Sequence, residues 1–320
     1  MSRGKIVLAG GSGFLGRVLA NWLSENGYDI VVLSRQAALT PCARCILWDG
    51  ETIAGWIDEL EGAVALINLA GRSVDCRYHA RNRRKILNSR VRATRVLGRA
   101  VAECVMPPEA WLNSSTATIY KHTYGDPHGE NGEIAATREA NDEFSIEVAR
   151  KWEDEFARAE CPNTRKLVLR TAMVLDAVPG TVYEVLRRLA TFGLGGRMDD
   201  GKQFLSWIHA DDFCRSVQWL IEQPSAAGPY NISAPTPITN ADAMQRFRQT
   251  VGLPLGLPST RWMLEIGAFL LRTETELIIK SRRVVPARLL REGFSFEYPD
   301  LSLAITALES KRKQAIDAPM

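Results

Sequence analysis

The feature that most constrains this chain is a glycine string, GGSGFLG, over residues 10–16. An apolar strand-like run, Lys5–Ala9, leads directly into it, and an amphipathic helical pattern follows over residues 14–26. Glycine allows the backbone to turn tightly and to approach a pyrophosphate, because a side chain at Gly10 or Gly13 would block that approach. The opening helix would present free N–H groups and its positive dipole end to the phosphates. In this context the string predicts a dinucleotide-binding βαβ unit, whereas alone it would also fit a simple tight turn.

The second predicted strand, Asp29–Ser34, indicates which dinucleotide is bound, because it ends in Ser34 and Arg35. An acidic side chain here would hydrogen-bond the ribose 2′-hydroxyl of NAD and repel a 2′-phosphate. A hydroxyl and a guanidinium suit a phosphate instead, so we expect NADP(H) in preference to NAD(H). The alternative is that Arg35 is an ordinary solvated loop residue.

The length and composition are those of an ordinary globular protein. The chain has 320 residues, of which 46% are hydrophobic and 24% charged, enough for one large domain with or without a small one. A net charge of +3 is too small to indicate nucleic acid or an anionic membrane as a partner. No apolar run approaches the length of a membrane span, and no leader pattern precedes the first strand. We therefore expect a cytoplasmic protein with a small-molecule substrate; the sequence does not determine its oligomeric state.

The six cysteines give no metal site. Cys42 and Cys45 form a CxxC pair, but no second pair or suitably spaced histidine completes a zinc site. A redox role for the pair is an alternative, but the motif follows Pro41 rather than opening a helix. We expect reduced thiols and no bound metal.

Strand-like runs alternate with helical patterns through the first half of the chain. This alternation predicts an α/β fold with a doubly wound parallel sheet of the Rossmann type. A further strand-like run over 204–208 leads into a helix after Asp211, and from residue 235 the pattern is mainly helical. The six main strands are predicted over 5–9, 29–34, 45–48, 63–68, 110–114 and 166–170, and the clearest helices over 14–26, 80–104 and 141–159.

These patterns suggest a division into two units. We expect an NADP-binding Rossmann domain over 1–180, completed by about 204–234. Residues 181–203 and 235–308 would form a smaller substrate-binding lobe, and the polar stretch 309–320 a frayed tail.

Ligands of open parallel sheets bind beyond the carboxyl ends of the strands. The small-residue turn at Leu69 and Ala70, after the fourth predicted strand, would let the backbone approach a cofactor, although it also fits a simple strand-to-helix turn. The helix over 80–104 carries eight basic residues, without the interleaved aromatics of a nucleic-acid surface. We interpret it as a solvated face from which one or two side chains reach the cofactor phosphates.

Several longer segments narrow the assignment. They are LNSRVRAT (87–94), KWE (151–153), LRTAMVL (169–175), GLGG (193–196), SWIHADD (206–212) and VPARLLREGFSFEYPD (285–300). With the glycine string they resemble the extended short-chain dehydrogenase/reductase superfamily and its NAD-dependent epimerase/dehydratase group. The likeness is to an atypical branch labelled epimerase family protein or nucleoside-diphosphate-sugar epimerase. It covers nearly the whole chain, and the last segment resembles that branch's small C-terminal domain of unassigned function.

The resemblance implies cofactor contacts at the matching positions. The glycine loop would bind the pyrophosphate, and Ser34 and Arg35 would bind the 2′-phosphate. Leu69 and Ala70 would form the turn that lies beside the cofactor. Arg90 and Met173 would also touch the dinucleotide, and Lys85 is a further candidate. The expected cofactor-binding residues are therefore Gly10, Gly11, Ser12, Gly13, Phe14, Leu15, Ser34, Arg35, Leu69, Ala70, Lys85, Arg90 and Met173.

The usual catalytic dyad of this superfamily is missing. Hydride-transferring members carry a tyrosine and a lysine four residues apart on one helix face, where the lysine lowers the tyrosine pKa for acid–base work. None of the seven tyrosines has a lysine four residues later. When the KWE segment is aligned on Glu153, the tyrosine and lysine positions hold Ser145 and Ala149.

Candidate replacements follow the fifth predicted strand, where the chain reads STATIYKHTYG over 115–125. The branch often carries Ser-Ala-x-Gly-Tyr-Tyr-Gly here, and this chain departs from it. Ser115, or its neighbour Ser114, fits the serine that holds the substrate oxygen. Tyr120 or Tyr124 could act as the acid, with Lys121 or His122 nearby. We take Ser115 and Tyr120 as the candidate catalytic residues; the alternative for Tyr120 is a packing role.

A polar cluster at His209, Asp211 and Asp212 resembles a metal or acid–base site. We expect Asp211 or Asp212 to cap the following helix and His209 to be a hydrogen-bonded core residue. Trp207 could line the substrate cleft.

Two functions are compatible with these features. One is an NADP(H)-dependent oxidoreductase or epimerase-like enzyme, acting on a carbonyl, hydroxyl or nucleotide-sugar compound. The other is a catalytically weak NADP(H)-binding sensor or regulatory protein. The missing dyad favours the second, whereas the GLGG loop and Trp207 favour the first. We favour the enzyme because the fold usually hosts one, although fold alone is a weak basis for assigning chemistry.

Overall fold

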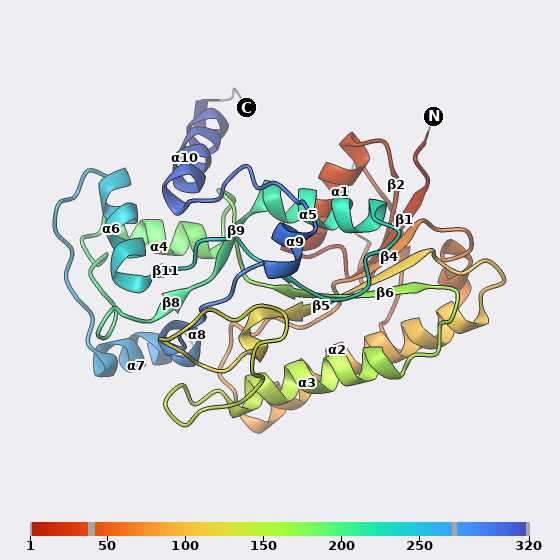
Figure 1. Cartoon of the computed structure of the whole chain (residues 1–320), viewed down its shortest axis with the longest axis horizontal. Helices are drawn as coiled ribbons and strands as arrows, with labels where there is room; N and C mark the ends of the chain where they lie inside the picture. Colours follow the sequence, from red (N-terminus) through yellow and green to blue (C-terminus); the bar gives the residue numbers. More distant parts are fainter. Residues whose placement is uncertain (1, 38–41, 271–273, 318–320) are drawn as a thin grey trace.

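The apolar runs of the sequence assemble into a seven-stranded parallel sheet (Figure 1). The computed structural model describes residues 2–37, 42–270 and 274–317. The strand order β10-β6-β5-β4-β1-β2-β3 is that of a doubly wound Rossmann fold, so the predicted fold class is confirmed. The strands are β1 (Lys5–Ala9), β2 (Asp29–Ser34), β3 (Arg44–Leu47), β4 (Ala65–Asn68), β5 (Ala110–Thr116), β6 (Arg165–Thr171) and β10 (Gly228–Ile232).

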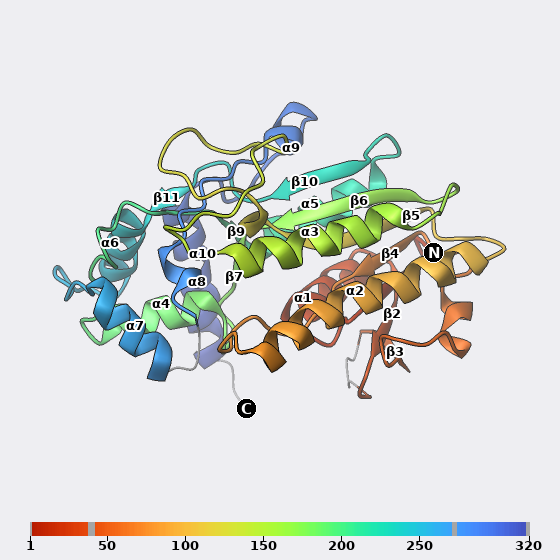
Figure 2. The same ribbon diagram turned by 90° about the horizontal axis from the view of Figure 1, so that it is seen from below.

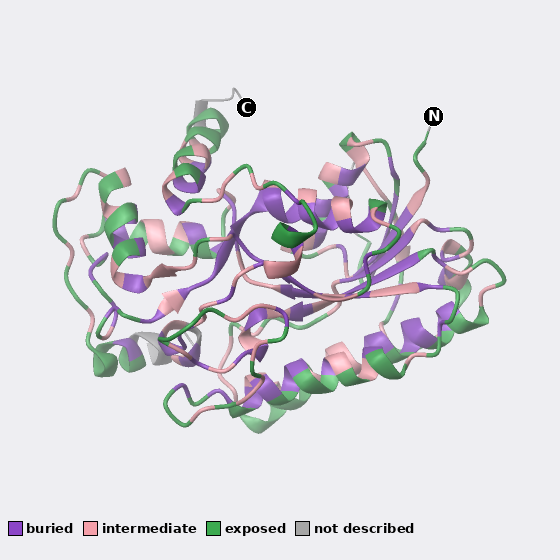
Figure 3. Ribbon diagram, in the orientation of Figure 1, coloured by how far each residue is buried: buried purple, intermediate pink, exposed green. Residues whose placement is uncertain are grey.

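Helices cover both faces of this sheet. Helices α1 (Phe14–Glu25) and α5 (Ala210–Glu222) lie on one face, and α2 (Ala80–Glu103) and α3 (Glu143–Arg158) run side by side on the other (Figures 1 and 2). Successive side chains of a strand point to opposite faces. Leu8 therefore packs in the core with α1 and α5, while Val7 packs in the core with α2 and α3. Figure 3 shows the buried sheet between helices with exposed outer faces.

The order of the strands reverses between β1 and β4. Chain segments leave this point in opposite directions, β2 and β3 to one side and β5, β6 and β10 to the other. A crevice forms at such a switch point, and the glycine loop after β1 lies at its mouth. The sheet thus places the loop where a dinucleotide binds in this architecture.

The expected strand over 204–208 is two strands in two different sheets. β8 (Phe204–Leu205) pairs antiparallel with β11 (Ile238–Thr239), and β9 (Trp207–His209) pairs parallel with β7 (Met173–Leu175). Ser206 separates them, because its hydroxyl donates to the Arg282 carbonyl at 2.8 Å and accepts from the Val284 N–H at 2.8 Å.

A smaller lobe lies beside the sheet and is mainly helical. It contains α4 (Val182–Thr191), α6 (Asn240–Thr250), α7 (Arg261–Leu270), α8 (Glu276–Ile279) and α10 (Leu301–Asp317). The stretch expected as a frayed tail, 309–320, is helical as far as Asp317, where α10 ends; residues 318–320 lie outside the described residues. Leu301, Ile305 and Leu308 share one helix face and are buried with Tyr183 and Phe247, which stabilises the helix.

The C-terminal segment was expected to lie in that lobe throughout residues 235–308. Part of it lies elsewhere. After α8 it returns to the main sheet, where Val284 bridges to His128 and α9 (Ala287–Arg291) packs beside β10. Leu289 and Phe294 are buried in the same core as α1 and α5. The segment therefore joins the small lobe to the edge of the Rossmann sheet.

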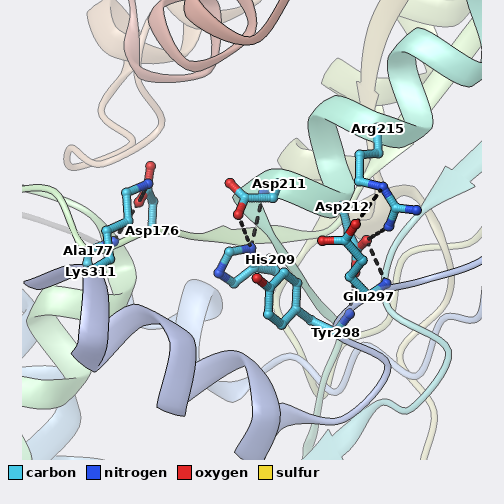
Figure 4. A network of polar contacts seen from close by, with 9 residues as sticks. All are labelled: Asp176, Ala177, His209, Asp211, Asp212, Arg215, Glu297, Tyr298 and Lys311. Carbon is cyan, nitrogen blue, oxygen red and sulfur yellow. Dashed lines mark hydrogen bonds and ion pairs between the residues drawn. The ribbon is translucent and has the colours of Figure 1, made fainter.

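A buried aspartate holds the end of this return (Figure 4). The Asp212 carboxylate accepts hydrogen bonds from the backbone N–H groups of Glu297 at 3.0 Å and Tyr298 at 2.8 Å, and it pairs with Arg215 at 2.7 Å. The Tyr298 ring stacks on His209 with 3.9 Å between centroids. Farther along, Lys311 of α10 pairs with the buried Asp176 at 2.8 Å.

The expected cap of α5 by Asp211 or Asp212 is wrong. The N-cap is His209, whose Nδ1 accepts from the Asp211 N–H at 3.1 Å. Burial lowers the pKa of His209 from 6.5 to about 4, although the charges of Asp212 and Asp176 oppose this shift. His209 is thus a neutral core residue, as expected, and also the cap.

The pKa of His209 makes stability depend on pH. The unfolded chain binds a proton near pH 6.5 and the folded chain only near pH 4, so stability falls as the pH drops between these values, by up to about 3 kcal/mol. His209→Asn keeps a capping acceptor but does not titrate, so its unfolding free energy should fall less over this range. Urea unfolding at several pH values measures this, and parallel profiles for the two proteins would contradict it.

Candidate functional site

The main cavity of the described structure lies at the carboxyl ends of β1, β4 and β5. Its volume is about 570 Å³. The glycine loop and the start of α1 form one wall, the segment after β4 a second, and one face of α3 the third. Seven of the expected site residues line it: Gly10, Gly13, Phe14, Leu15, Leu69, Arg90 and Ser115.

The glycine loop touches the turn after β4. Gly10 has a φ of +77°, and a Cβ built on it would lie 2.7 Å from the Ala70 Cα, so only glycine fits. A Cβ on Gly16 would overlap the backbone of Gly11. Because glycine has no Cβ, the first turn of α1 can pack directly against the loop. Gly13 is the N-cap of α1 and supplies no side-chain cap, so the first N–H groups of the helix are left for a ligand.

Four of the expected residues lie behind or beside this loop rather than in the cavity wall. Gly11 packs against the Leu8 side chain, and the Ser12 hydroxyl accepts a hydrogen bond of 3.0 Å from the Ser34 hydroxyl. Ser34 is buried at the end of β2, whereas the next residue, Arg35, is exposed. The pair thus lies beside the glycine loop but outside the cavity.

A buried amide network shapes the turn at Leu69 and Ala70. The Asn68 side chain accepts from the Ala70 N–H at 3.0 Å and donates to Asn113 at 2.7 Å and Thr94 at 3.0 Å. The sequence alone assigned no role to these side chains. The signal was present, since Asn68 and Asn113 are polar residues inside strand-like apolar runs.

Arg90 is a cation in the cavity wall without an anionic partner among the contacts of the described residues. Its Nη1 donates to the carbonyls of Arg72 and Ile86, each at 3.0 Å, and its guanidinium lies 5.1 Å from the Trp152 ring centre. Burial lowers the pKa of Arg90 to about 10. A partly buried guanidinium that is balanced only by carbonyls favours an anionic ligand.

Lys85 and Met173 do not line the cavity. Lys85 is exposed on α2. Met173 lies half-buried in β7 and packs against the small lobe. The contacts expected for these two therefore have no geometric support.

Ser115 lines the cavity and is held by a charged chain. Its hydroxyl donates to Glu153 Oε1 at 2.6 Å, and Arg170 binds the same carboxylate through two nitrogens at 2.9 and 2.8 Å. Arg170 also donates to the Tyr120 hydroxyl at 2.9 Å. Glu153 was used only to align the KWE segment, and the structure shows that it orients Ser115.

The acid role expected for Tyr120 has no support from its position. Tyr120 is 1% exposed, and its hydroxyl donates to Asn231 at 2.8 Å and faces Arg170 rather than the cavity. Burial raises the pKa of Tyr120, although the Arg170 charge opposes this. Its alternative Tyr124 is 43% exposed and packs edge-on against His122, also outside the cavity wall.

The face of α3 that meets the cavity carries Ser145, Val148, Ala149 and Trp152. Ser145 and Ala149 are the positions at which the standard dyad would stand. Ala149 offers no polar group, while Ser145 donates to Glu276 Oε2 at 2.9 Å.

No cluster of three or more potential metal ligands occurs in the described ranges. In the same part of the chain, no helix is both long enough and apolar enough to cross a membrane.

Comparisons with protein families place these features in context. The profile described as "NAD dependent epimerase/dehydratase family" matches residues 6–148, and one described as "Domain of unknown function (DUF1731)" matches residues 260–308. Epimerase family protein YfhF of Bacillus subtilis is 30% identical over 313 residues, which cover 96% of this chain and 99% of that protein. Human epimerase family protein SDR39U1 is 27% identical, covering 94% and 98%.

Solved structures share the fold. The crystal structure of the human epimerase family protein SDR39U1 with NADPH superimposes with a TM-score of 0.83 at 24% identity, covering 96% of this chain and 99% of that one. The nucleoside-diphosphate sugar epimerase from Corynebacterium glutamicum gives a TM-score of 0.71 at 27% identity, covering the whole chain and 62% of that protein.

Arg90→Ala should weaken NADPH binding. Charge-assisted hydrogen bonds contribute about 1.5–3 kcal/mol each, so the Kd should rise about tenfold or more. Arg99→Ala, on an exposed position of the same helix, is the control and should leave the Kd unchanged. Titration of NADPH fluorescence measures both, and an equal Kd for wild type and Arg90→Ala would exclude a role for Arg90 in binding.

Tyr120→Phe should affect stability rather than the cofactor. Loss of the buried hydroxyl leaves Asn231 and one Arg170 donor without a partner, which costs about 1–3 kcal/mol. Urea unfolding should show this loss while the NADPH Kd stays the same. A higher NADPH Kd at an unchanged unfolding free energy would show instead that Tyr120 takes part in cofactor binding.

Proposed function

The chain belongs to the NAD dependent epimerase/dehydratase family, whose members bind NAD(P), and we propose that it is an NADP(H)-dependent oxidoreductase or epimerase-like enzyme. Its substrate would be a carbonyl or hydroxyl compound, with nucleotide-linked sugars among the candidates. The observation that carries the proposal is the main cavity, which joins a glycine loop, an uncapped helix start and the partly buried Arg90 guanidinium. All three favour a phosphate-bearing ligand.

The choice of NADP(H) rests on the end of β2. Ser34 and Arg35 offer a hydroxyl and a cation where an NAD-specific protein would carry an acid. The Ser34–Ser12 hydrogen bond holds this position against the glycine loop. The human relative whose structure contains NADPH supports the same cofactor.

Ser115 is the group best placed to hold the reacting oxygen. When bound, the nicotinamide supplies or accepts a hydride. The Ser115 proton is engaged by Glu153, so its oxygen lone pairs are left for the hydroxyl of a substrate in the cavity. Arg170 keeps Glu153 in position through the two-point ion pair.

The alternative function is an NADP(H)-binding sensor or regulatory protein with little turnover. Ala149 at the lysine position and the inward-facing Tyr120 favour it, because neither can take part in the usual proton transfer. Incubating the protein with NADPH and a panel of aldehydes, ketones and nucleotide sugars tests both readings. NADPH binding without any oxidation would favour the sensor.

Arg35→Ala should lower the affinity for NADPH but not for NADH. Only NADPH carries the 2′-phosphate, so losing the guanidinium should raise its Kd about tenfold. NADH is the matched control, since it contacts the same glycine loop. Fluorescence titration with both cofactors measures the ratio, and an equal loss for both would show that Arg35 does not recognise the 2′-phosphate.

A further inference from the structure

The C-terminal segment places charged groups directly behind the wall of the main cavity, and the function proposed above does not use them. Glu276 lies in α8, and Lys280 and Arg282 follow it. All three belong to the region matched by the domain of unknown function, residues 260–308. They do not line the cavity themselves but bond to two residues that do, Ser145 and Thr118.

Glu276 stands directly behind Ser145. The side chain is 7% exposed, and its Oε2 accepts the Ser145 hydroxyl at 2.9 Å. Oε1 is buried and makes no hydrogen bond among the described residues. A buried carboxyl with one oxygen unsatisfied is costly as an anion, which favours its protonated form.

The groups that face Glu276 come from several elements. Tyr78 precedes α2, Asp142 is the N-cap of α3, and Lys280 and Arg282 follow α8. Burial is the largest influence and raises the pKa of Glu276. Arg282, Ser145 and Lys280 lower it, whereas Asp142 raises it further. Lys280 pairs with Asp142 at 2.5 Å, so much of its charge is already balanced.

Tyr78 belongs to the same cluster. Burial and the Glu276 charge raise the pKa of the Tyr78 hydroxyl, while a hydrogen bond with Ser145 lowers it. Ser145 thus lies between a phenol and a carboxyl.

A second cavity of about 300 Å³ gives Glu276 its own route to solvent. Glu276 lines it, together with the exposed Arg83 and Glu265. Tyr78 and Phe144 line both cavities and form the partition between them. A proton can therefore reach Glu276 without passing through the cofactor cavity.

Positive charge reaches the same wall through Thr118, which also lines the main cavity. Arg282 Nε donates to the Thr118 hydroxyl at 3.0 Å, and Lys280 Nζ donates to its carbonyl at 2.6 Å. These two contacts orient Thr118 and place positive charge behind this part of the cavity wall.

We propose that Ser145 and Glu276 replace the missing tyrosine–lysine dyad as a proton relay, with Ser145 touching the substrate oxygen and Glu276 acting through it. This inference rests on the NADP(H)-dependent function proposed above. In the reducing direction, a hydride from NADPH forms the new C–H bond at the carbonyl carbon. The carbonyl oxygen takes a proton from Ser145 Oγ, and Ser145 takes one from Glu276. The Glu276 carboxylate then recovers a proton from water in the second cavity.

The first test compares variants in cofactor binding and in NADPH oxidation, with 4-nitrobenzaldehyde as the first carbonyl probe. Glu276→Gln and Ser145→Ala should keep the NADPH Kd while kcat falls about 100-fold, the usual size of a general-acid contribution. Glu276→Asp should recover part of the rate. The control Glu147→Gln makes the same change on the exposed face of α3 and should match wild type.

The pH profile separates a relay from a structural role. The wild-type rate should fall as the pH rises through the raised pKa of Glu276, because the acid form is lost, and Glu276→Gln should lack this limb. Equal profiles for wild type and Glu276→Gln would overturn the relay. Failure of wild type to bind NADPH would instead overturn the proposed function.

The second test needs no turnover. Infrared spectra over a pH series should show a protonated carboxyl band that persists above the ordinary glutamate pKa of about 4.3, that Glu276→Gln removes and that Ser145→Ala shifts. NADP⁺ should lower this pKa, because its nicotinamide is positively charged. A Glu276 that titrates in the ordinary range, or that ignores NADP⁺, overturns the relay even if no probe is reduced.

Discussion

The buried ion pair between Lys280 and Asp142 determines where the C-terminal segment meets the cofactor cavity. Both side chains are 0% exposed, and their charged atoms lie 2.5 Å apart. Removing one partner of such a pair costs about 3–5 kcal/mol, because the other charge is left buried and unbalanced. Asp142 begins α3 and Lys280 follows α8, so the pair presses α8 against the first turn of α3. The contacts of Glu276 with Ser145 and of Arg282 with Thr118 depend on this arrangement.

Different residues of the cavity serve cofactor binding and proton transfer. In the function proposed here the glycine loop and Arg90 bind the cofactor phosphates, and both come from the first 90 residues. The groups that could move a proton come from elsewhere: Ser115 is oriented by Glu153, and Ser145 by Glu276 of the distant C-terminal region. A chain can therefore lose the tyrosine and lysine of α3 and still present polar, partly charged groups to a substrate.

Local patterns predicted the elements whose stabilising contacts lie within one βαβ unit. β1, β2 and α1 begin where expected, because apolar alternation and glycine placement act over a few residues. Errors arose where a distant partner decides the outcome. Ser206 splits the expected 204–208 strand through bonds to the 282–284 segment, and α10 stays helical to Asp317 because its apolar face is buried near Tyr183. Tyr120 turns inward because Arg170 and Asn231, 50 or more residues away, bind its hydroxyl.

The sequence by itself determined the Rossmann fold and the position of the phosphate-binding loop, because glycine spacing and strand periodicity are local properties. It also showed that the usual dyad is absent, since that needs only a count of residues along α3. Only the tertiary structure decided what stands in its place. Glu276 lies 131 residues after Ser145, and no sequence pattern predicts the hydrogen bond between the two side chains. Their contact exists because a buried ion pair and the return of the chain to the sheet edge bring the C-terminal segment to the cavity wall.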